Sequence, residues 1–163
     1  MAAPGTDPTP TRRARRGRVA ASGEVVVHRP RAAVADYVLD PATLAQWRGE
    51  PTAVRSAGPG GPQVGARYRV RVPGRRDETM RTDEVVALVP LERMTLRTVA
   101  GGPPLTLDVR VSPEGHGSTL VRATVEGTVD GPAGLLAPLT ARAARRSLAV
   151  DLARLKTILE LPR

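Results

Sequence analysis

The residue best suited to acid–base chemistry in this sequence is Glu84, a carboxylate within a largely apolar strand pattern. On the strand pairing that the pattern favours, Glu84 faces Thr98 on one neighbouring strand and Tyr68 on the other. A carboxylate in an apolar cavity has a raised pKa and can act as a general acid or base. Glu84 and Tyr68 are therefore the candidate catalytic residues. The alternative is a bulge at Val85–Val86 that turns Glu84 to solvent.

Other kinds of catalytic or metal chemistry have few residues to support them. The chain has no cysteine, which excludes disulfides, thiolate zinc sites and cysteine nucleophiles. Its 2 histidines, His28 and His116, are too few for a multi-histidine metal site, and we expect them to be structural and surface residues respectively. Neither glycine-rich segment, 58–62 or 101–104, precedes a helix start as a phosphate-binding loop does. The sequence therefore predicts neither a metal nor a cofactor.

Positive charge is concentrated near the start of the chain. The 163 residues carry a net charge of +9, and five arginines and one aspartate lie within residues 1–18. Because this segment has almost nothing to bury, we expect a disordered basic tail at 1–18 and a folded domain at 19–163. The tail either contacts nucleic acid or anionic lipid transiently or serves only to keep the protein in solution.

The remaining composition narrows the partners and the location. Aromatic residues make up 2% of the chain, too few for base-stacking platforms, so we expect no specific nucleic-acid binding. No apolar run approaches the roughly 18 to 20 residues of a membrane span, and the first residues lack the apolar core of a secretory signal. We therefore expect a cytoplasmic protein, and the sequence leaves its oligomeric state undetermined.

The hydrophobic pattern indicates one α+β domain that could position these residues. A first strand at 24–28 precedes two short helices at about 30–38 and 41–48. Later strands have no crossover helix between them, so the sheet should be antiparallel, with about seven strands. A helical stripe follows over 132–160, with a kink or break near Pro138. The later strands are expected at 51–57, 65–72, 79–89, 93–99, 104–112 and 118–129.

The pairing of the strands follows from matching their apolar residues across the turns. Because a one-residue slip would invert every side chain, a face that is apolar on every strand supports the register. A tighter turn at Pro90–Leu91 would instead place Val85 and Ala87 inside and Glu84 outside. On the outer face of the sheet, Asp108 should oppose Arg122. On the inner face the expected pairs are Met94–Val109, Leu96–Leu107, Leu107–Ala123, Val109–Val121, Leu88–Met94, Val86–Leu96, Met80–Val72, and Glu84 with Thr98 and Tyr68.

A sheet with one apolar face needs a cover, and the long helical segment is the candidate. A helix about 10–12 Å wide is narrower than seven strands at about 4.8 Å each, so the sheet should curl around it and leave a space. The chain has no Phe, 1 Trp and 2 Tyr to fill that space. Concave apolar spaces commonly bind small molecules. The residues expected to line it are Tyr37, Trp47, Val70, Met80, Val86, Met94, Leu96, Thr98, Leu107, Val109, Val121, Ala123, Leu148 and Leu152.

Three segments, over about residues 20–160, resemble the START-like superfamily, also called SRPBCC or the polyketide cyclase/dehydrase and lipid-transport proteins. They are RPRAAVADYVLDPATLAQW, EVVALVPLERMTLRT and GLLAPLTARAARRSLAVDLARLKTILE. The resemblance implies a helix-grip fold, with the sheet wrapped on the C-terminal helix, and a hydrophobic ligand between them. It implies no universal catalytic residues. Many relatives place an aromatic residue or His after the tryptophan, whereas Trp47 is followed here by Arg48 and Gly49.

Three functions follow from the residues and the resemblance together. The first is binding of a small hydrophobic molecule such as a lipid or polyketide. The second is a cyclase or dehydratase reaction that uses Glu84 and Tyr68 for proton transfer. The third is an interaction protein whose interior is closed and whose basic tail makes the contacts.

Overall fold

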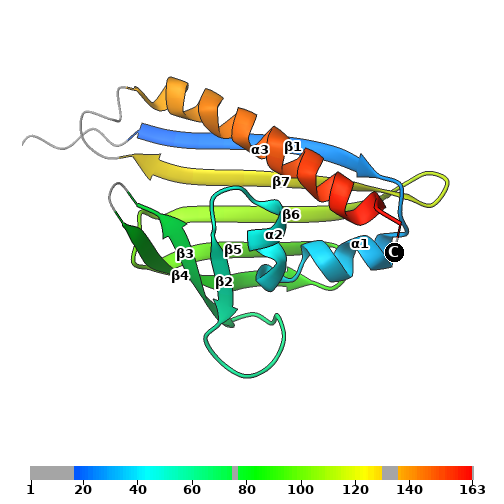
Figure 1. Ribbon diagram of the computed structural model, residues 1–163, viewed down its shortest axis with the longest axis horizontal. Helices are drawn as coiled ribbons and strands as arrows, with labels where there is room; N and C mark the ends of the chain where they lie inside the picture. Colours follow the sequence, from blue (N-terminus) through cyan, green and yellow to red (C-terminus); the bar gives the residue numbers. More distant parts are fainter. Residues whose placement is uncertain (1–16, 75–76, 130–135, 163) are drawn as a thin grey trace, which may run out of the picture.

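The fold is an antiparallel sheet packed against a long C-terminal helix, as predicted. The computed structural model describes residues 17–74, 77–129 and 136–162. Its sheet has seven strands in the order β1-β7-β6-β5-β4-β3-β2 (Figure 1). The strands are β1 (Gly17–Val27), β2 (Ala53–Ser56), β3 (Arg67–Pro73), β4 (Glu78–Val89), β5 (Arg93–Ala100), β6 (Leu105–Glu114) and β7 (Ser118–Val129); the helices are α1 (Arg31–Val38), the 3-10 turn η1 (Pro41–Thr43), α2 (Leu44–Trp47) and α3 (Ala137–Glu160).

Prolines and a capping carboxylate set the starts of the helices. Pro30 immediately precedes α1, and the side chain of Asp40 accepts a hydrogen bond of 2.9 Å from the backbone N–H of Ala42 at the start of η1. Pro138 lies in the first turn of α3, where its missing N–H costs no helical hydrogen bond, and the helix runs from Ala137 to Glu160. Residues 132–135, which the predicted helix and its predicted kink or break include, lie outside the described residues. β1 begins at Gly17, earlier than expected, and residues 1–16 of the expected tail lie outside the described residues.

The helices cover the inner face of the sheet unequally. α3 packs chiefly on β1, while α1 lies over β6 and β7, and α2 lies beside α3 (Figure 1). The close approach of α3 to β1 depends on Gly23, since a Cβ there would lie 3.0 Å from Leu152 Cδ1. Leu148, Leu152 and Leu155 are fully buried in this contact.

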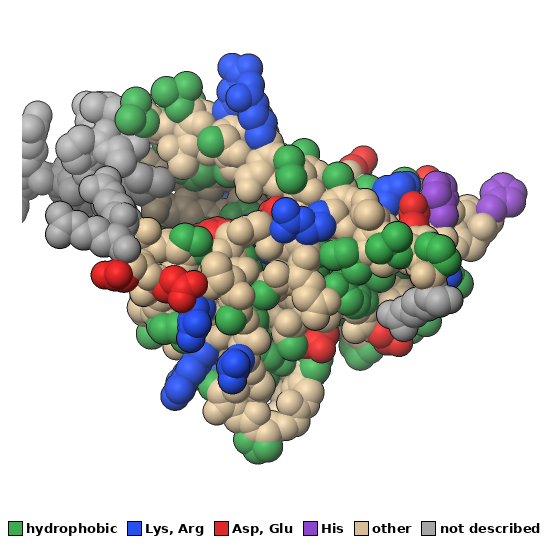
Figure 2. Space-filling view, viewed as in Figure 1, with side chains coloured by type: hydrophobic (Ala, Val, Ile, Leu, Met, Phe, Trp, Pro, Cys, Tyr) green, Lys and Arg blue, Asp and Glu red, His purple; other side chains and the backbone are tan. Residues whose placement is uncertain are grey.

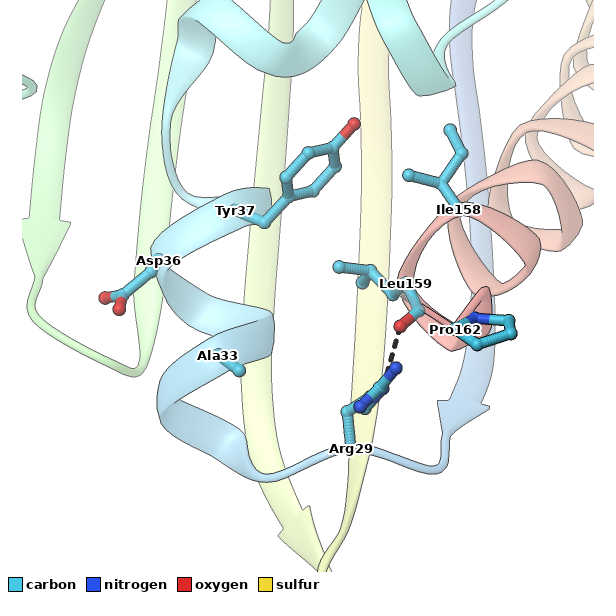
Figure 3. A pocket seen from close by; sticks show the side chains of 7 residues that line it. All are labelled: Arg29, Ala33, Asp36, Tyr37, Ile158, Leu159 and Pro162. Atoms are coloured by element: carbon cyan, nitrogen blue, oxygen red, sulfur yellow. Dashed lines mark hydrogen bonds between the residues drawn. The ribbon is translucent and has the colours of Figure 1, made fainter.

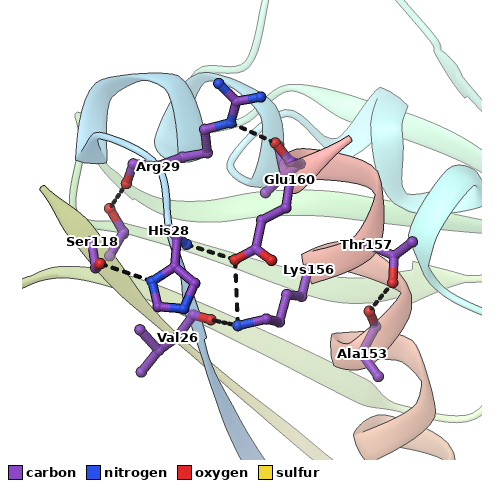
Figure 4. Close-up of polar contacts among 10 residues, drawn as sticks. Val26, His28, Arg29, Ser118, Ala153, Lys156, Thr157 and Glu160 are labelled. Atoms are coloured by element: carbon purple, nitrogen blue, oxygen red, sulfur yellow. Dashed lines mark hydrogen bonds and ion pairs between the residues drawn. The ribbon is translucent and has the colours of Figure 1, made fainter. Parts of the chain in front are cut away.

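The C-terminal end of α3 is fixed to the link between β1 and α1 by a group of polar contacts (Figure 4). Glu160 accepts a hydrogen bond of 2.7 Å from the backbone N–H of His28 and pairs with Lys156 at 3.3 Å. Lys156 also donates to the carbonyl of Val26 at 2.7 Å. Arg29 donates to the carbonyl of Leu159 at 3.0 Å. The bond from Arg29 satisfies a carbonyl that the helix end leaves without a partner, and the other contacts join the end of α3 to residues 26–28.

The predicted pairing of β5 with β6 is confirmed, and that of β6 with β7 is displaced by two residues. Met94 lies opposite Val109, and Leu96 opposite Leu107, as expected. Leu107, however, pairs with Val125 in place of Ala123. The expected loop at 113–117 is shorter, because β6 continues to Glu114 and its partner strand begins at Ser118. An even displacement keeps the same residues on the inner face, so the burial pattern is unchanged.

The displacement changes the charge pairs on the outer face. Asp108 lies opposite Thr124, and Arg122 lies opposite Arg110, so the predicted Asp108–Arg122 pair does not form. Asp108 accepts hydrogen bonds from Arg93 at 2.6 Å and from Arg110 at 2.9 Å. Burial by itself would raise the pKa of Asp108, but hydrogen bonds from Thr95 and the two arginines outweigh it and lower the pKa.

A bulge in β4 reverses the predicted orientation of the segment before it. Leu88 still opposes Met94, but Val85 opposes Leu96 and leaves Val86 as the extra residue. Val85 is fully buried and Val86 only partly so, which corrects the predicted inward position of Val86. Glu84 therefore points to the outer face, where it pairs with Arg67 at 2.8 Å. The alternative of a bulge is thus confirmed for Glu84.

Because of the same bulge, the predicted pairing of β3 with β4 is wrong by one residue. Val72 lies opposite Thr79, one residue from the expected Met80, and Tyr68 lies opposite Asp83 in place of Glu84. Met80 is consequently 49% exposed and cannot line the interior. Asp83 is buried instead, on the inner face between Tyr68 and Thr98.

Candidate functional site

The centre of the space between sheet and helices is filled by the protein's own side chains. Trp47, Met94 and Val109 are fully buried there. The cavity that remains at the centre is about 20 Å³, room for about one water molecule. Four of the predicted residues line this small cavity, namely Val70, Leu96, Thr98 and Leu107. The wide empty interior expected from the shortage of aromatic residues is therefore absent at this position.

A larger space, the α3 groove, lies beneath the N-terminal half of α3. Its volume is about 240 Å³, and it is bounded by α3, by β1 and β7, and by the turn between β5 and β6. Figure 2 shows a hollow under this part of the helix. The groove exists because α3 presents small side chains here, Ala144 and Ser147, where its C-terminal half presents leucines. Its apolar walls include Val19, Leu105, Val125 and Leu148.

Arg48 lies at the inner end of the α3 groove and also lines the small central cavity. Its side chain is 11% exposed and pairs with the buried carboxylate of Asp151 on α3 at 3.2 Å. The backbone N–H of Gly49 donates to the same carboxylate at 2.9 Å. Burial lowers the pKa of Arg48, and the charges of Asp151 and Glu50 oppose that shift.

Three buried polar atoms around this ion pair have no hydrogen-bond partner among the described residues. They are Nε1 of Trp47, Nη1 of Arg48 and Oδ2 of Asp151. The guanidinium of Arg48 lies 5.9 Å from the centre of the Trp47 ring. A buried polar atom without a hydrogen bond costs about 1–3 kcal/mol, so each of these atoms calls for a partner beyond the described side chains, such as a water molecule or a ligand atom.

A second buried charged pair borders the central cavity. Arg81 donates to Oδ2 of Asp83 at 3.1 Å, and the hydroxyl of Thr98 donates to Oδ1 at 2.8 Å. Arg81 also lies 3.6 Å from Glu50. The carboxylate of Asp83 is thereby held by a cation and a hydroxyl. Chemically, the site combines apolar walls, a guanidinium with a donor to spare and a buried carboxylate.

The two tyrosines predicted to take part in chemistry or binding lie elsewhere. Tyr68 is buried under the sheet, and burial, followed by the charge of Asp40, raises the pKa of its hydroxyl. It lines neither the central cavity nor the α3 groove. Tyr37 donates to the side chain of Gln46 at 2.6 Å and borders a separate surface groove.

That surface groove has a volume of about 730 Å³ and lies between α1 and the C-terminal end of α3 (Figure 3). Ala33, Ile158 and Pro162 contribute apolar atoms, and Asp36 points away from them. Arg29, its cation, is engaged with carbonyls at the end of α3. We therefore place the candidate site at the smaller α3 groove, where Arg48 has a donor without a partner.

The other predicted lining residues divide between core and surface. Leu148 borders the α3 groove. Trp47 and five other predicted residues are buried in the core and border neither the α3 groove nor the central cavity. Glu84, Met80 and Val86 are displaced from the inner face by the bulge in β4. The five core residues are Met94, Val109, Val121, Ala123 and Leu152.

The sequence analysis did not select the three buried charged residues of the candidate site, although the sequence contains a signal for two of them. Asp151 lies at helical spacing from Leu148, Leu152 and Leu155, so an acid on an apolar stripe indicated a buried partner. Arg48 directly follows the buried Trp47, at the position where the sequence departs from the pattern of the family that it resembles. Asp83 was missed because the favoured register placed Glu84 inside, whereas the bulge turns Glu84 outward and Asp83 inward.

The described helices contain no apolar stretch long enough to cross a membrane. Within residues 17–74, 77–129 and 136–162, no three His, Asp or Glu side chains gather where a metal ion could be held.

Comparisons with known proteins place this geometry in a fold group. No curated protein has significant sequence similarity to the chain. A START superfamily protein from Mycobacterium smegmatis is 17% identical, with a TM-score of 0.72 over 86% of this chain and 97% of that one. The Zhui aromatase/cyclase from Streptomyces sp. R1128 is also 17% identical, with a TM-score of 0.70 over 88% and 94%.

A third similar structure is the di-domain ARO/CYC BexL from the BE-7585A biosynthetic pathway. It is 22% identical, with a TM-score of 0.67, over 87% of this chain and 46% of that one. At such identities the likeness shows the fold alone. The family model for polyketide cyclase / dehydrase and lipid transport, however, matches residues 18–160 of the sequence itself. The chain therefore belongs to the polyketide cyclase / dehydrase and lipid transport family.

Proposed function

We propose that the protein binds a compact hydrophobic molecule in the α3 groove, with an oxygen atom of that molecule hydrogen-bonded to Arg48. The observation that carries this proposal is the buried Nη1 of Arg48, which has no partner among the described residues and lies at the end of an apolar groove. A carbonyl, hydroxyl or carboxylate oxygen is the group that a guanidinium N–H would take.

The size and lining of the groove favour a small ligand. Sites for small molecules usually measure about 300–1,000 Å³, and the α3 groove holds about 240 Å³. Burial of apolar ligand surface would contribute about 25 cal/mol per Å² before the costs of association. A ring system or a short acyl chain that carries one oxygen group matches this space better than a long lipid.

Filling the groove from the protein side tests the proposal. We expect Ala144→Phe, at a residue that lines the groove, to weaken binding of the fluorescent probe anilinonaphthalene sulfonate at least about tenfold, because the ring occupies the space. Ala143→Phe adds the same ring on the exposed side of α3 and is the matched control. Native mass spectrometry of the purified protein would identify a molecule that co-purifies. Equal probe affinity in both variants would contradict the proposal.

An enzyme of the cyclase or dehydratase type is the second candidate, and the buried Asp83–Arg81 pair supports it. In that case the acid–base group would be Asp83, because Glu84 faces outward and pairs with Arg67. The two candidates differ in the fate of the ligand. A co-purified molecule that is recovered unchanged after incubation favours binding alone, whereas a change in mass that is lost in Asp83→Asn favours catalysis.

A further inference from the structure

The outward side of α3 combines exposed apolar residues with arginines. At about 100° per residue, Leu139, Arg142, Arg146 and Val150 lie opposite the buried leucine stripe. Leu139 is 64% exposed and Val150 61% exposed, and Leu136, just before the helix, is 56% exposed. In Figure 2, hydrophobic and basic side chains lie beside one another along the edge that α3 forms.

No acid balances these arginines. Between residues 136 and 154 the sequence has four arginines and one carboxylate, Asp151, which is buried against Arg48. Among the described residues, none of the four arginines forms an ion pair. The arginines are Arg142, Arg145, Arg146 and Arg154.

The outer face of the sheet is also rich in arginine but carries both signs of charge. Among the described residues Arg55, Arg69 and Arg97 have no ion pair there, but several other arginines do. There Arg67 pairs with Glu84, and Arg122 with Glu24, each at 2.8 Å, and Arg93 pairs with Asp108 at 2.6 Å. A solvated surface usually carries such mixed charges. A helix face with exposed leucine and valine among unpaired arginines is typical of helices that lie on membranes.

We propose that the outward face of α3 docks on an anionic membrane surface. The arginines would be attracted to acidic headgroups, each by about 1 kcal/mol near the surface. Leu136, Leu139 and Val150 would enter the boundary between headgroups and acyl chains. The exposed apolar side chains would bury no apolar surface against a nucleic-acid backbone. This favours a lipid surface over nucleic acid as the partner.

Such docking would bring the α3 groove to the membrane, because the same half of the helix forms one wall of the groove. A hydrophobic ligand could then exchange with the bilayer over a short distance. The docking surface itself does not depend on the ligand, since Leu139, Arg142 and Arg146 face away from the groove and line none of it.

Sedimentation with vesicles tests the docking surface in the full-length protein. Vesicles of phosphatidylcholine alone are compared with vesicles of phosphatidylcholine and phosphatidylglycerol. We expect binding only to the second kind, and a loss of about a hundredfold in the triple variant R142Q/R145Q/R146Q. The control, R55Q/R69Q/R97Q, removes three exposed arginines from the outer face of the sheet and should bind as the unmodified protein does.

Two further variants distinguish lipid from other anionic partners and the contribution of α3 from that of residues 2–16. Leu136→Gln with Leu139→Gln keeps every charge, and we expect it to weaken vesicle binding while leaving affinity for duplex DNA unchanged. Deletion of residues 2–16 should weaken vesicle binding less than the α3 triple variant. Equal losses in the two triple variants, vesicle binding that only the deletion abolishes, or stronger binding to duplex DNA than to vesicles would overturn the proposal. Circular dichroism confirms that each variant is folded.

Discussion

The two halves of α3 rest on the same sheet but are held in different ways. The C-terminal half buries Leu148, Leu152 and Leu155 completely and carries the polar contacts of Lys156 and Glu160 at its end. The N-terminal half, from Ala137 to Ser147, buries no residue completely and touches the sheet through half-buried alanines. The α3 groove lies under this second half.

The difference shows that side-chain size along one stripe decides where the interior opens. Leucines at helical spacing fill the distance to β1, and Gly23 allows the closest approach. Alanines at the equivalent positions leave the same distance unfilled, which opens the groove. One continuous helix can therefore anchor the fold at one end and form the wall of a binding space at the other.

The largest expected effect comes from the ion pair at the boundary between the halves. Asp151→Ala would leave the buried cation of Arg48 without its counter-charge. We expect a loss of about 3–5 kcal/mol in the free energy of unfolding, measured by urea denaturation. Asp36→Ala, at an exposed carboxylate, is the control and should change stability by less than about 0.5 kcal/mol.

The double variant Arg48→Met with Asp151→Leu sharpens this test. Replacement of a buried ion pair by apolar residues of similar volume is often neutral or stabilising. We therefore expect the double variant to recover most of the stability lost in Asp151→Ala and to lose affinity for the groove probe, since the polar end of the site is gone. A double variant as unstable as the single one would show that Asp151 stabilises the fold in another way.

A matched pair of truncations compares the halves directly. Leu152→Ala removes a fully buried side chain from the C-terminal half, and we expect a loss of about 3 kcal/mol. Leu139→Ala removes the same atoms from the exposed face of the N-terminal half and should cost less than about 0.5 kcal/mol. Thermal and urea unfolding measure both. Similar losses at the two positions would contradict the difference between the halves.

Most of the fold could be predicted because it depends on patterns within single segments. The alternating strands, the proline-started helices and the leucine stripe of α3 are each visible over a few turns or residues. The pairing of β5 with β6 was predictable because the turn at Gly101 needs a positive φ, here 77°, which glycine adopts readily. The pairing of β6 with β7 failed because three residues close a turn for which five were expected.

The candidate site was less predictable because it depends on contacts between distant segments. The bulge at Val86 decides that Asp83 faces inward and Glu84 outward, and nothing local in that strand sets its position. The ion pair of Arg48 with Asp151 joins residues far apart in the sequence. The small size of the central cavity reflects how Trp47 and the leucines of α3 pack together, which residue counts do not reveal.

The smallest expected effect concerns the polar contacts at the end of the anchored half. The backbone N–H of His28 lowers the pKa of Glu160, and Lys156 lowers it further, although burial acts in the opposite direction. An acid with a lowered pKa in the folded state stabilises the protein above its ordinary pKa, about 4.5 for this group. That stability is lost as the pH falls below this value and through the lowered pKa of the folded state.

We therefore expect Glu160→Gln to reduce the free energy of unfolding at about pH 7 and to reduce it less at about pH 3, where a larger fraction of the native carboxylate is protonated. Asp108, whose pKa is also lowered, contributes equally to both proteins and cancels in the difference. Lys156→Gln should retain most of the pH dependence, because the donor from His28 remains. If Glu160→Gln had the same effect at both pH values, the polar contacts would not anchor α3 through the charge of Glu160, and the leucine stripe alone would distinguish its two halves.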